Sequence, residues 1–212
     1  IKHAKDILGA KLIVGEEVCN HVLSQRLAKA LRLITMAVEV DLMPAEAFVQ
    51  EKSASGRVSA LLDFGSLTSR PHEIFLPDVY EKQLHYIYQG LAEERYFQRA
   101  GQAVPAGEKT DIEIQHFDFA QLARLSVHSA GSDFLSVLDR EEQNLTAAGV
   151  VLIQIWLKLT WPWLGELVEG LRRRRYFLGG LLPRWFDDDG LFMQKRIGQP
   201  NWEGINLLTD RA

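Results

Sequence analysis

Cysteine is almost absent from this chain of 212 residues, and its scarcity excludes two classes of protein. Cys19 is the single cysteine, so neither a framework of internal disulfides nor a zinc site made of several cysteines can form. A lone thiol is typical of proteins that stay in a reducing compartment. We therefore predict a cytoplasmic protein.

The chain also lacks an excess of positive charge. Its 24 lysines and arginines are outnumbered by 28 aspartates and glutamates, which gives a formal net charge of −4. Such a chain has no overall positive field to attract nucleic acid, which would need a local basic patch. The four arginines at 172–175 are the obvious candidate, but we interpret them as the last turn of a helix, where the helix dipole favours cations. We predict no binding of nucleic acid.

Long apolar segments are missing as well. The longest strongly apolar run, residues 149–159, is interrupted by Gln154 and Lys158 and is shorter than the roughly 20 residues of a membrane-spanning helix. The N-terminal residues are charged and contain no hydrophobic region typical of a signal peptide. We expect no association with a membrane. Because the sequence begins with Ile1 and not with methionine, we also expect it to be part of a longer product.

Several enzyme motifs are absent. There is no glycine-rich Walker loop, no Gly-x-Ser-x-Gly elbow and no dinucleotide fingerprint. The six histidines form no His-x-x-x-His pair, and the acidic run Asp187, Asp188 and Asp189 lacks the spacing of a calcium loop. We predict no bound metal. Because the acidic run precedes a glycine and lies between two apolar runs, we interpret it as the turn of a β-hairpin.

The features that are present form an alternation of helical and extended patterns. Apolar spacing predicts helices at residues 1–8, 21–33, 78–91, 132–148 and 162–175. Alternating or compact apolar runs predict strands at residues 11–18, 33–42, 57–67, 111–118, 122–129, 150–159, 177–185 and 190–196. The helix–strand–helix–strand order of the first 42 residues recurs in the second half, which indicates a weak internal duplication.

The order of elements in the second half resembles that of the acyl-CoA N-acyltransferase (GNAT) superfamily. The matching segments are LARLSVHS, DFLSVLDREEQNLTAAG, VVLIQIWLKL, WPWLGELVEGLRRRRYF and LGGLLPRWFDDDGLFMQKR. The resemblance implies an α/β (α+β) fold with a mixed, largely antiparallel sheet flanked by helices. It also implies an N-acetyltransferase that moves an acyl group from acetyl-CoA to an amine of a small molecule or a protein.

The first segment resembles the end of another copy of the same fold, through IKHAKDILGA, KLIVGEEV and NHVLSQRLAKALRL. Two-copy GNAT-like regions occur in some bacterial proteins, where they can be attached to a histidine-kinase-like ATPase domain. The resemblance thus implies an upstream ATPase-like domain in a longer protein. We expect residues 1–52 to be the C-terminal part of a first copy, residues 53–198 a second GNAT-like domain, and residues 199–212 a tail.

The resemblance also assigns candidate site residues. Its pyrophosphate-binding turn matches HSAGSDFL, so Ser129 and Gly131 are the candidate cofactor-binding residues there. Asn20 and Gln25 are candidates for hydrogen bonds to an arm of the cofactor, although helix capping or exposure to solvent explains them equally well. Apart from the resemblance, Glu16 and Glu17 end a predicted strand, and Glu17 is the candidate general base for an amine substrate; the alternative is that these acids are a solvated strand end beside a helix cap.

The chain departs from the family pattern at three points. The turn has the single glycine Gly131 and no basic residue, whereas the family uses several glycines after an arginine or glutamine. The usual tyrosine acid is replaced by Ala28 and Arg172 in the two copies, and Arg32 and Leu33 stand where the family has a Gly-Phe pair. These departures favour an alternative, a non-catalytic interaction or sensory module that has lost CoA binding. Such a module would use an apolar surface to form a homodimer.

Overall fold

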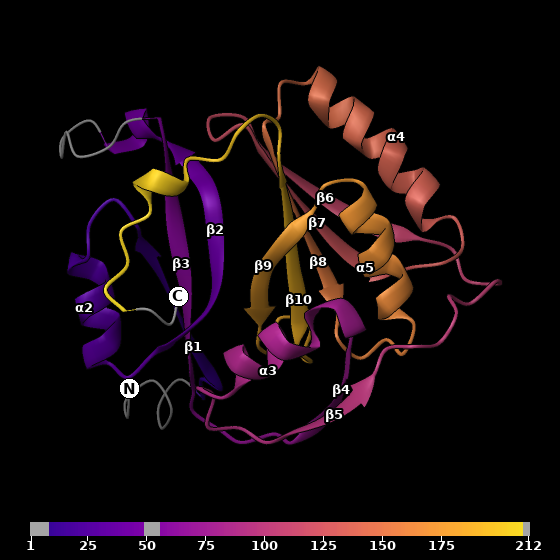
Figure 1. Ribbon diagram of the computed structural model, residues 1–212, viewed down its shortest axis with the longest axis horizontal. Coiled ribbons are helices and arrows are strands. Elements are labelled where there is room, and N and C mark those ends of the chain that lie inside the picture. The colour runs from indigo at the N-terminus through magenta and orange to yellow at the C-terminus, as the bar shows by residue number, and fades with distance from the viewer. Residues whose placement is uncertain (1–8, 49–55, 210–212) are drawn as a thin grey trace.

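The computed structural model describes residues 9–48 and 56–209, which form a mixed α/β fold (Figure 1). The predicted helix at residues 1–8 lies outside the described residues. The described strands are β1 (Leu12–Val18), β2 (Ile34–Pro44), β3 (Arg57–Ser66), β4 (His72–Leu76), β5 (Arg95–Arg99), β6 (Asp111–Phe117), β7 (Leu122–Ser129), β8 (Leu152–Lys158), β9 (Phe177–Leu182) and β10 (Gly190–Arg196). The described α-helices are α2 (Leu23–Ala30), α3 (Glu81–Tyr88), α4 (Phe134–Ala147) and α5 (Leu164–Arg173).

Eight of the strands form one sheet in the order β1-β3-β2-β9-β10-β8-β7-β6. All neighbours in this sheet are antiparallel except β7 and β8, which are parallel and are connected through α4. The prediction of a mixed, largely antiparallel sheet flanked by helices is therefore confirmed. Strands β4 and β5 form a separate parallel pair.

Two segments of the sheet have the same topology. The N-terminal unit, β1-α2-β2-β3, and the C-terminal unit, β8-α5-β9-β10, each place their last strand between their first two. In the N-terminal unit Leu62 pairs with Ala37, and in the C-terminal unit Phe192 pairs with Gly180. Ala37 and Gly180 also pair with each other, so the two units meet about this central pair. Strand β3 therefore pairs with both β1 and β2, and these three strands are adjacent in the sheet.

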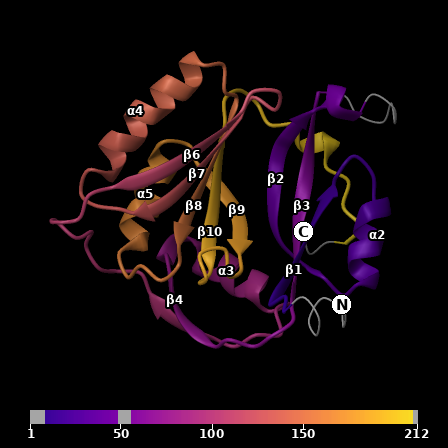
Figure 2. The same cartoon turned by 180° about the vertical axis from the view of Figure 1, so that it is seen from behind.

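The large sheet is strongly curled. Strands β2 and β7 are separated by three other strands, which in a flat sheet would hold them roughly 19 Å apart. Nevertheless Arg124 Nη2 on β7 donates to Glu39 Oε1 on β2 at 3.0 Å, and Gln154 Nε2 on β8 donates to the same oxygen at 2.8 Å. The helices lie on the outside of the curl: α2 covers the N-terminal unit, and α4 and α5 cover the opposite side (Figures 1 and 2).

The main core lies between the sheet and the helices α4 and α5. Helix α5 buries Leu164, Leu167, Val168 and Leu171, whose spacing puts them on one face. Strand β8 is buried on both faces, because it lies inside the curled sheet and is also covered by helices, and this explains its nearly continuous apolar sequence.

Several local predictions are confirmed and others need correction. Helix α5 ends within the arginine run, and the acidic run connects β9 to β10 as a hairpin. Helix α3 is shorter than predicted, because residues Asp78–Tyr80 form a 3-10 turn before it begins at Glu81. Strands β4 and β5 were not predicted; they are five residues long and lack a clean alternation of apolar and polar residues.

Candidate functional site

The turn that the resemblance assigns to acyl-CoA, before α4, is filled by the chain itself. The backbone N–H of Gly131 donates to Thr110 Oγ1 at 3.1 Å, and Ser129 Oγ donates to the carbonyl of Lys109 at 2.7 Å. A β-carbon added at Gly131 would lie 1.8 Å from the carbonyl oxygen of Glu108. The preceding loop therefore takes both the N–H donor and the space that a pyrophosphate would need at Gly131.

An acidic side chain also lies at this helix N-terminus. Asp133 Oδ1 accepts hydrogen bonds from Thr110 Oγ1 at 2.7 Å and from the Thr110 backbone N–H at 3.0 Å. These hydrogen bonds lower the pKa of Asp133, which keeps its carboxylate ionised. A carboxylate satisfies the positive end of the helix dipole and repels a second anion. Phosphate binding is thus disfavoured here by charge as well as by space.

Strands β7 and β8 do not pair at their C-terminal ends, where a lysine side chain of β8 forms a hydrogen bond with β7. The two strands pair from Leu122 with Leu152 to Ser126 with Trp156, and both continue beyond the last pair. There Lys158 Nζ donates to the carbonyl oxygen of His128 at 2.8 Å. The same ammonium lies 5.8 Å from the ring centroids of both Trp161 and Phe186.

The candidate base belongs to a different part of the sheet. Glu17 lies on β1, at one edge, whereas Ser129 ends β7 and Gly131 follows it; β7 is six strand spacings of about 4.8 Å away from β1 along the sheet. The candidate residues therefore form two separate groups. Glu17, Asn20 and Gln25 belong to the N-terminal unit, and Ser129 and Gly131 lie beside the C-terminal unit.

Glu17 forms a buried acid pair with Asp63 of β3, a partner that sequence analysis missed. Asp63 pairs with Gly15, and Glu17 is the next residue on the same face of β1. Gly15 has no side chain, and a β-carbon there would lie 2.3 Å from Glu17 Oε1, so the glycine leaves the room that the Glu17 carboxyl uses. Both acids are at least nine-tenths buried, and Thr35 of β2 hydrogen-bonds Asp63 from the other side.

The pair shares a proton near neutral pH. Burial, reinforced by the charge of Asp63 and the hydrogen bond between the two carboxyls, raises the pKa of Glu17 to about 8. Burial raises the pKa of Asp63 as well, against the hydrogen bonds from Thr35 and Glu17. Glu17 therefore carries the proton and donates it to the Asp63 carboxylate. The neighbouring thiol of Cys19 stays neutral, because burial raises its pKa to about 12.

We expect Glu17→Gln to make the protein more stable at pH 8 and to have little effect at pH 5. The unfolded chain releases the Glu17 proton near pH 4.5, whereas the folded chain retains it to about pH 8. The unfolded state thus binds fewer protons between these values, and the free energy of unfolding falls as the pH rises, by up to about 1.4 kcal/mol per pH unit. Urea unfolding at both pH values would measure this. Glu16→Gln, on the exposed face of β1, is the control; an equal gain from both variants would contradict the assignment.

Gln25 has a structural role, and Asn20 is not a helix cap. Gln25 Nε2 donates to the carbonyl of Asn206 at 2.8 Å, and Gln25 Oε1 accepts from the backbone N–H of Leu208 at 2.8 Å. The Gln25 amide thus fixes the C-terminal segment against α2 and is not available for a cofactor arm. Asn20 does not cap α2, whose N-cap residue is Val22.

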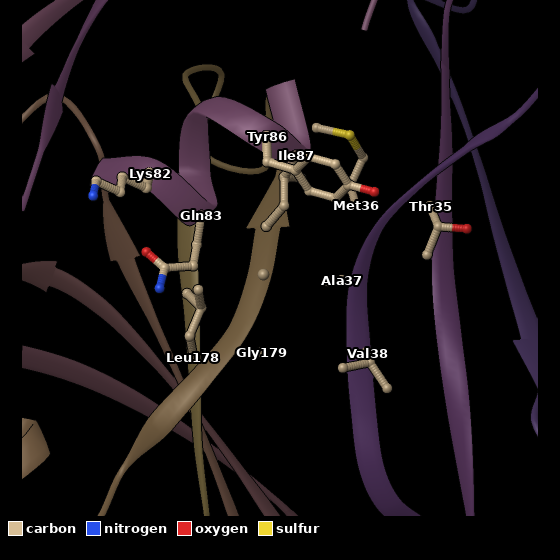
Figure 3. Close-up of a pocket in the computed structure, with 11 residues that line it drawn as sticks. Thr35, Met36, Ala37, Val38, Lys82, Gln83, Tyr86, Ile87, Leu178 and Gly179 are labelled. Carbon is tan, nitrogen blue, oxygen red and sulfur yellow. The ribbon is translucent and has the colours of Figure 1, made fainter. Parts of the chain in front are cut away.

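A cavity that was not predicted from the sequence lies where the two units meet. This seam pocket has a volume of about 470 Å³. Gln83, Tyr86 and Ile87 extend from α3 toward strands β2 and β9, whose residues form the opposite walls (Figure 3). The other lining residues are Thr35, Met36, Ala37, Val38, Lys82, Leu178, Gly179 and Gly180.

The seam pocket exists because β2 and β9 pair at a single position, Ala37 with Gly180. Beyond that pair, the side chain of Gln194 makes the hydrogen bonds to β2 that a neighbouring strand would otherwise make. Its Oε1 accepts from the N–H of Val40 at 2.9 Å, and its Nε2 donates to the carbonyl of Val38 at 2.7 Å. The two consecutive glycines in FLGGLLP were the signal that could have indicated this close backbone contact.

Three further findings bear on function. Within residues 9–48 and 56–209, no group of three or more histidine, cysteine, aspartate or glutamate side chains could hold a metal ion. None of the helices in the described part of the chain has the length and apolar character needed to cross a lipid bilayer. Comparison of the chain with protein-family models, curated proteins and solved structures found no match, so function has to be inferred from the residues themselves.

Proposed function

We propose that this chain is a GNAT-like sensory module that binds a small amphipathic molecule in the seam pocket and does not use acyl-CoA. Three features support the GNAT-like assignment: the parallel pair β7 and β8 joined through α4, the helix α5 that follows, and the terminal hairpin whose last strand lies next to β8. The repeated strand order of the N-terminal unit supports two copies of this topology.

The proposal depends chiefly on the contrast between two sites. The turn at Gly131 is occupied by Thr110, carries the ionised Asp133 and is covered by the carbonyl of Glu108. The seam pocket, by contrast, is within the range of about 300 to 1,000 Å³ that small-molecule sites occupy. Its walls are mainly apolar, and the polar side chains that line it are those of Thr35, Lys82, Gln83 and Tyr86.

The position of the seam pocket suits a sensor. Its walls come from both units and from α3, and between β2 and β9 the described residues form one ladder pair. A ligand that contacts both units would favour the relative arrangement that it fits best, and it can shift that equilibrium only by its differential affinity for the two arrangements.

The first test addresses acyl-CoA directly. We expect isothermal titration with acetyl-CoA to give no heat of binding at millimolar concentration, because the turn has no free space for the pyrophosphate. Coenzyme A without an acyl group should behave in the same way. Saturable binding of acetyl-CoA that is lost in Gly131→Ser, which adds a side chain at the turn, would instead support the second candidate function, an acyl-CoA-dependent N-acyltransferase.

The second test addresses the seam pocket. We expect the fluorescent probe anilinonaphthalene sulfonate to bind the folded protein, and Gln83→Trp to weaken this binding at least tenfold, because the exposed Gln83 lines the pocket and an indole would fill it. Gln89→Trp, at an exposed position outside the pocket lining near the end of the same helix, is the matched control. Equal probe binding in both variants would show that the seam pocket is not the site.

A further inference from the structure

A second cavity lies on the other side of Thr35, above the acid pair of Glu17 and Asp63. We propose that this acid-pair pocket binds a small organic cation, an alkylammonium or guanidinium group, whose N–H donors meet the free oxygen of Asp63, the acid of the pair that lines the cavity. The site is separate from the seam pocket, so the inference does not depend on the function proposed above.

The cavity is lined by one carboxylate and by apolar side chains. It has a volume of about 210 Å³, comparable to roughly seven water molecules at about 30 Å³ each. Asp63 lines it directly, and the walls include Leu33, Ile34 and Leu61. Leu208 of the C-terminal segment, which Gln25 holds in place, contributes another wall.

The two carboxyls are incompletely satisfied. Asp63 is 4% exposed, and its Oδ1 has no hydrogen-bond partner among the described residues. The same is true of Glu17 Oε2. An unpaired carboxylate oxygen is costly to bury, so a ligand that supplies both N–H donors and a positive charge would be bound strongly there. No arginine or lysine within residues 9–48 and 56–209 forms a salt bridge with either acid.

Cation binding at this pair is coupled to proton release. While Glu17 keeps its proton, the pair carries one negative charge, and a cation that displaces the proton meets two. Affinity should therefore increase from pH 6 to pH 8.5. The other charged or titratable groups near the pair are the neutral thiol of Cys19, the ammonium of Lys29, which lines the cavity, and the carboxylate of Glu16, whose charge acts from the opposite, exposed face of β1.

The experiment is an NMR titration of the ¹⁵N-labelled chain with n-butylammonium chloride. We expect saturable shifts at Leu61 and Leu208, without shifts at the seam residue Ile87, and a higher affinity at pH 8.5 than at pH 6. Asp63→Asn should weaken binding at least tenfold, and Glu17→Gln should remove its pH dependence. Glu16→Gln, a charge-matched change on the exposed face of β1, should change the affinity less than twofold. Uncharged 1-butanol should not produce the same shifts.

Three outcomes would overturn the proposal. One is the absence of saturable shifts in the wild-type chain. A second is binding that appears only in Lys29→Met, which would mean that the ammonium of Lys29 itself is the cation for this pocket. The third is equal affinity of the wild-type chain and Asp63→Asn, with the spectrum confirming that the variant is folded.

Discussion

Asp189→Asn is expected to lower the free energy of unfolding by about 3 to 5 kcal/mol, because it removes one of the two buried carboxylates that pair with Arg95 and leaves the guanidinium with Glu93 alone. Asp189 is fully buried at the end of the β9–β10 turn. Tyr88 Oη donates to its carboxylate at 2.8 Å and Arg95 Nε at 2.7 Å, while the backbone N–H of Arg184 donates at 3.0 Å. His72 Nε2 lies 3.4 Å from the same carboxylate. The group thus attaches the hairpin to α3, β4 and β5.

The charge of Asp189 is maintained by these contacts. Burial alone would raise its pKa, but the hydrogen bonds from His72 and Arg95 outweigh burial and hold the pKa well below the ordinary range. A depressed pKa gives stability that is present above the ordinary aspartate value of about 3.9 and is lost as the pH falls below it. The variant should therefore lose less stability on acidification than the wild-type chain.

Asp188→Asn is the matched control for this prediction. The neighbouring Asp188 forms a salt bridge with Arg70 at 3.4 Å, and both side chains are at least one-third exposed. An exposed pair of this kind contributes about 0 to 1 kcal/mol, so the control should unfold at nearly the wild-type urea concentration. A loss below about 1 kcal/mol for Asp189→Asn would contradict the role that we assign to this carboxylate.

Gly180→Ala is expected to have the second large effect, a loss of about 2 to 5 kcal/mol, because backbone strain adds to overpacking. Gly180 has φ of 138°, a conformation that L side chains rarely adopt. A β-carbon at this position would lie 2.2 Å from the carbonyl oxygen of Met36 and 2.5 Å from Ala37 Cα. Both contacts are with the backbone of β2, so no side-chain rotation can relieve them.

Gly180→Ala should destabilise the contact between β2 and β9 more than the rest of the sheet. Hydrogen exchange is expected to accelerate in β2 and β9 more than in β8, because the substitution removes the one ladder pair between the two units. Gly107→Ala is the control, since a β-carbon there meets no atom within 4 Å. Uniform acceleration across all strands, or unchanged exchange in β2, would contradict this description of the seam.

Local features of the fold could be predicted from the sequence because they depend on neighbouring residues. The polar acidic run between two apolar runs indicates the connection of a hairpin, although Gly190 itself begins β10, and the apolar spacing of α5 gives a helix with one buried face. The predicted duplication also follows from the order of patterns. The pairing of β4 with β5 could not be predicted, because it depends on contacts with α3 and Asp189 and not on an alternation in the strands themselves.

The site could be predicted only in part. Glu17 drew attention as an acid at the end of a strand, but the sequence does not indicate that Gly15 makes room for its carboxyl or that Asp63, 46 residues later, is its partner. Similarly, Gln25 is a polar residue on an amphipathic helix, and only the structure reveals that residues near position 206 use its amide.

The sequence by itself determined the helices α2 to α5 and the strands of the large sheet, with their order, because helix periodicity, strand alternation and turn residues act over a few positions. The tertiary structure alone decided which chemical groups meet. The curl of the sheet brings Glu39 to Arg124, the loop before β6 closes the turn at Gly131, and Gly180 lets β9 approach β2 beside the seam pocket. Each of these contacts joins residues far apart in the chain, and burial, which sets the charge of Glu17 and Asp63, exists only once the whole sheet has folded.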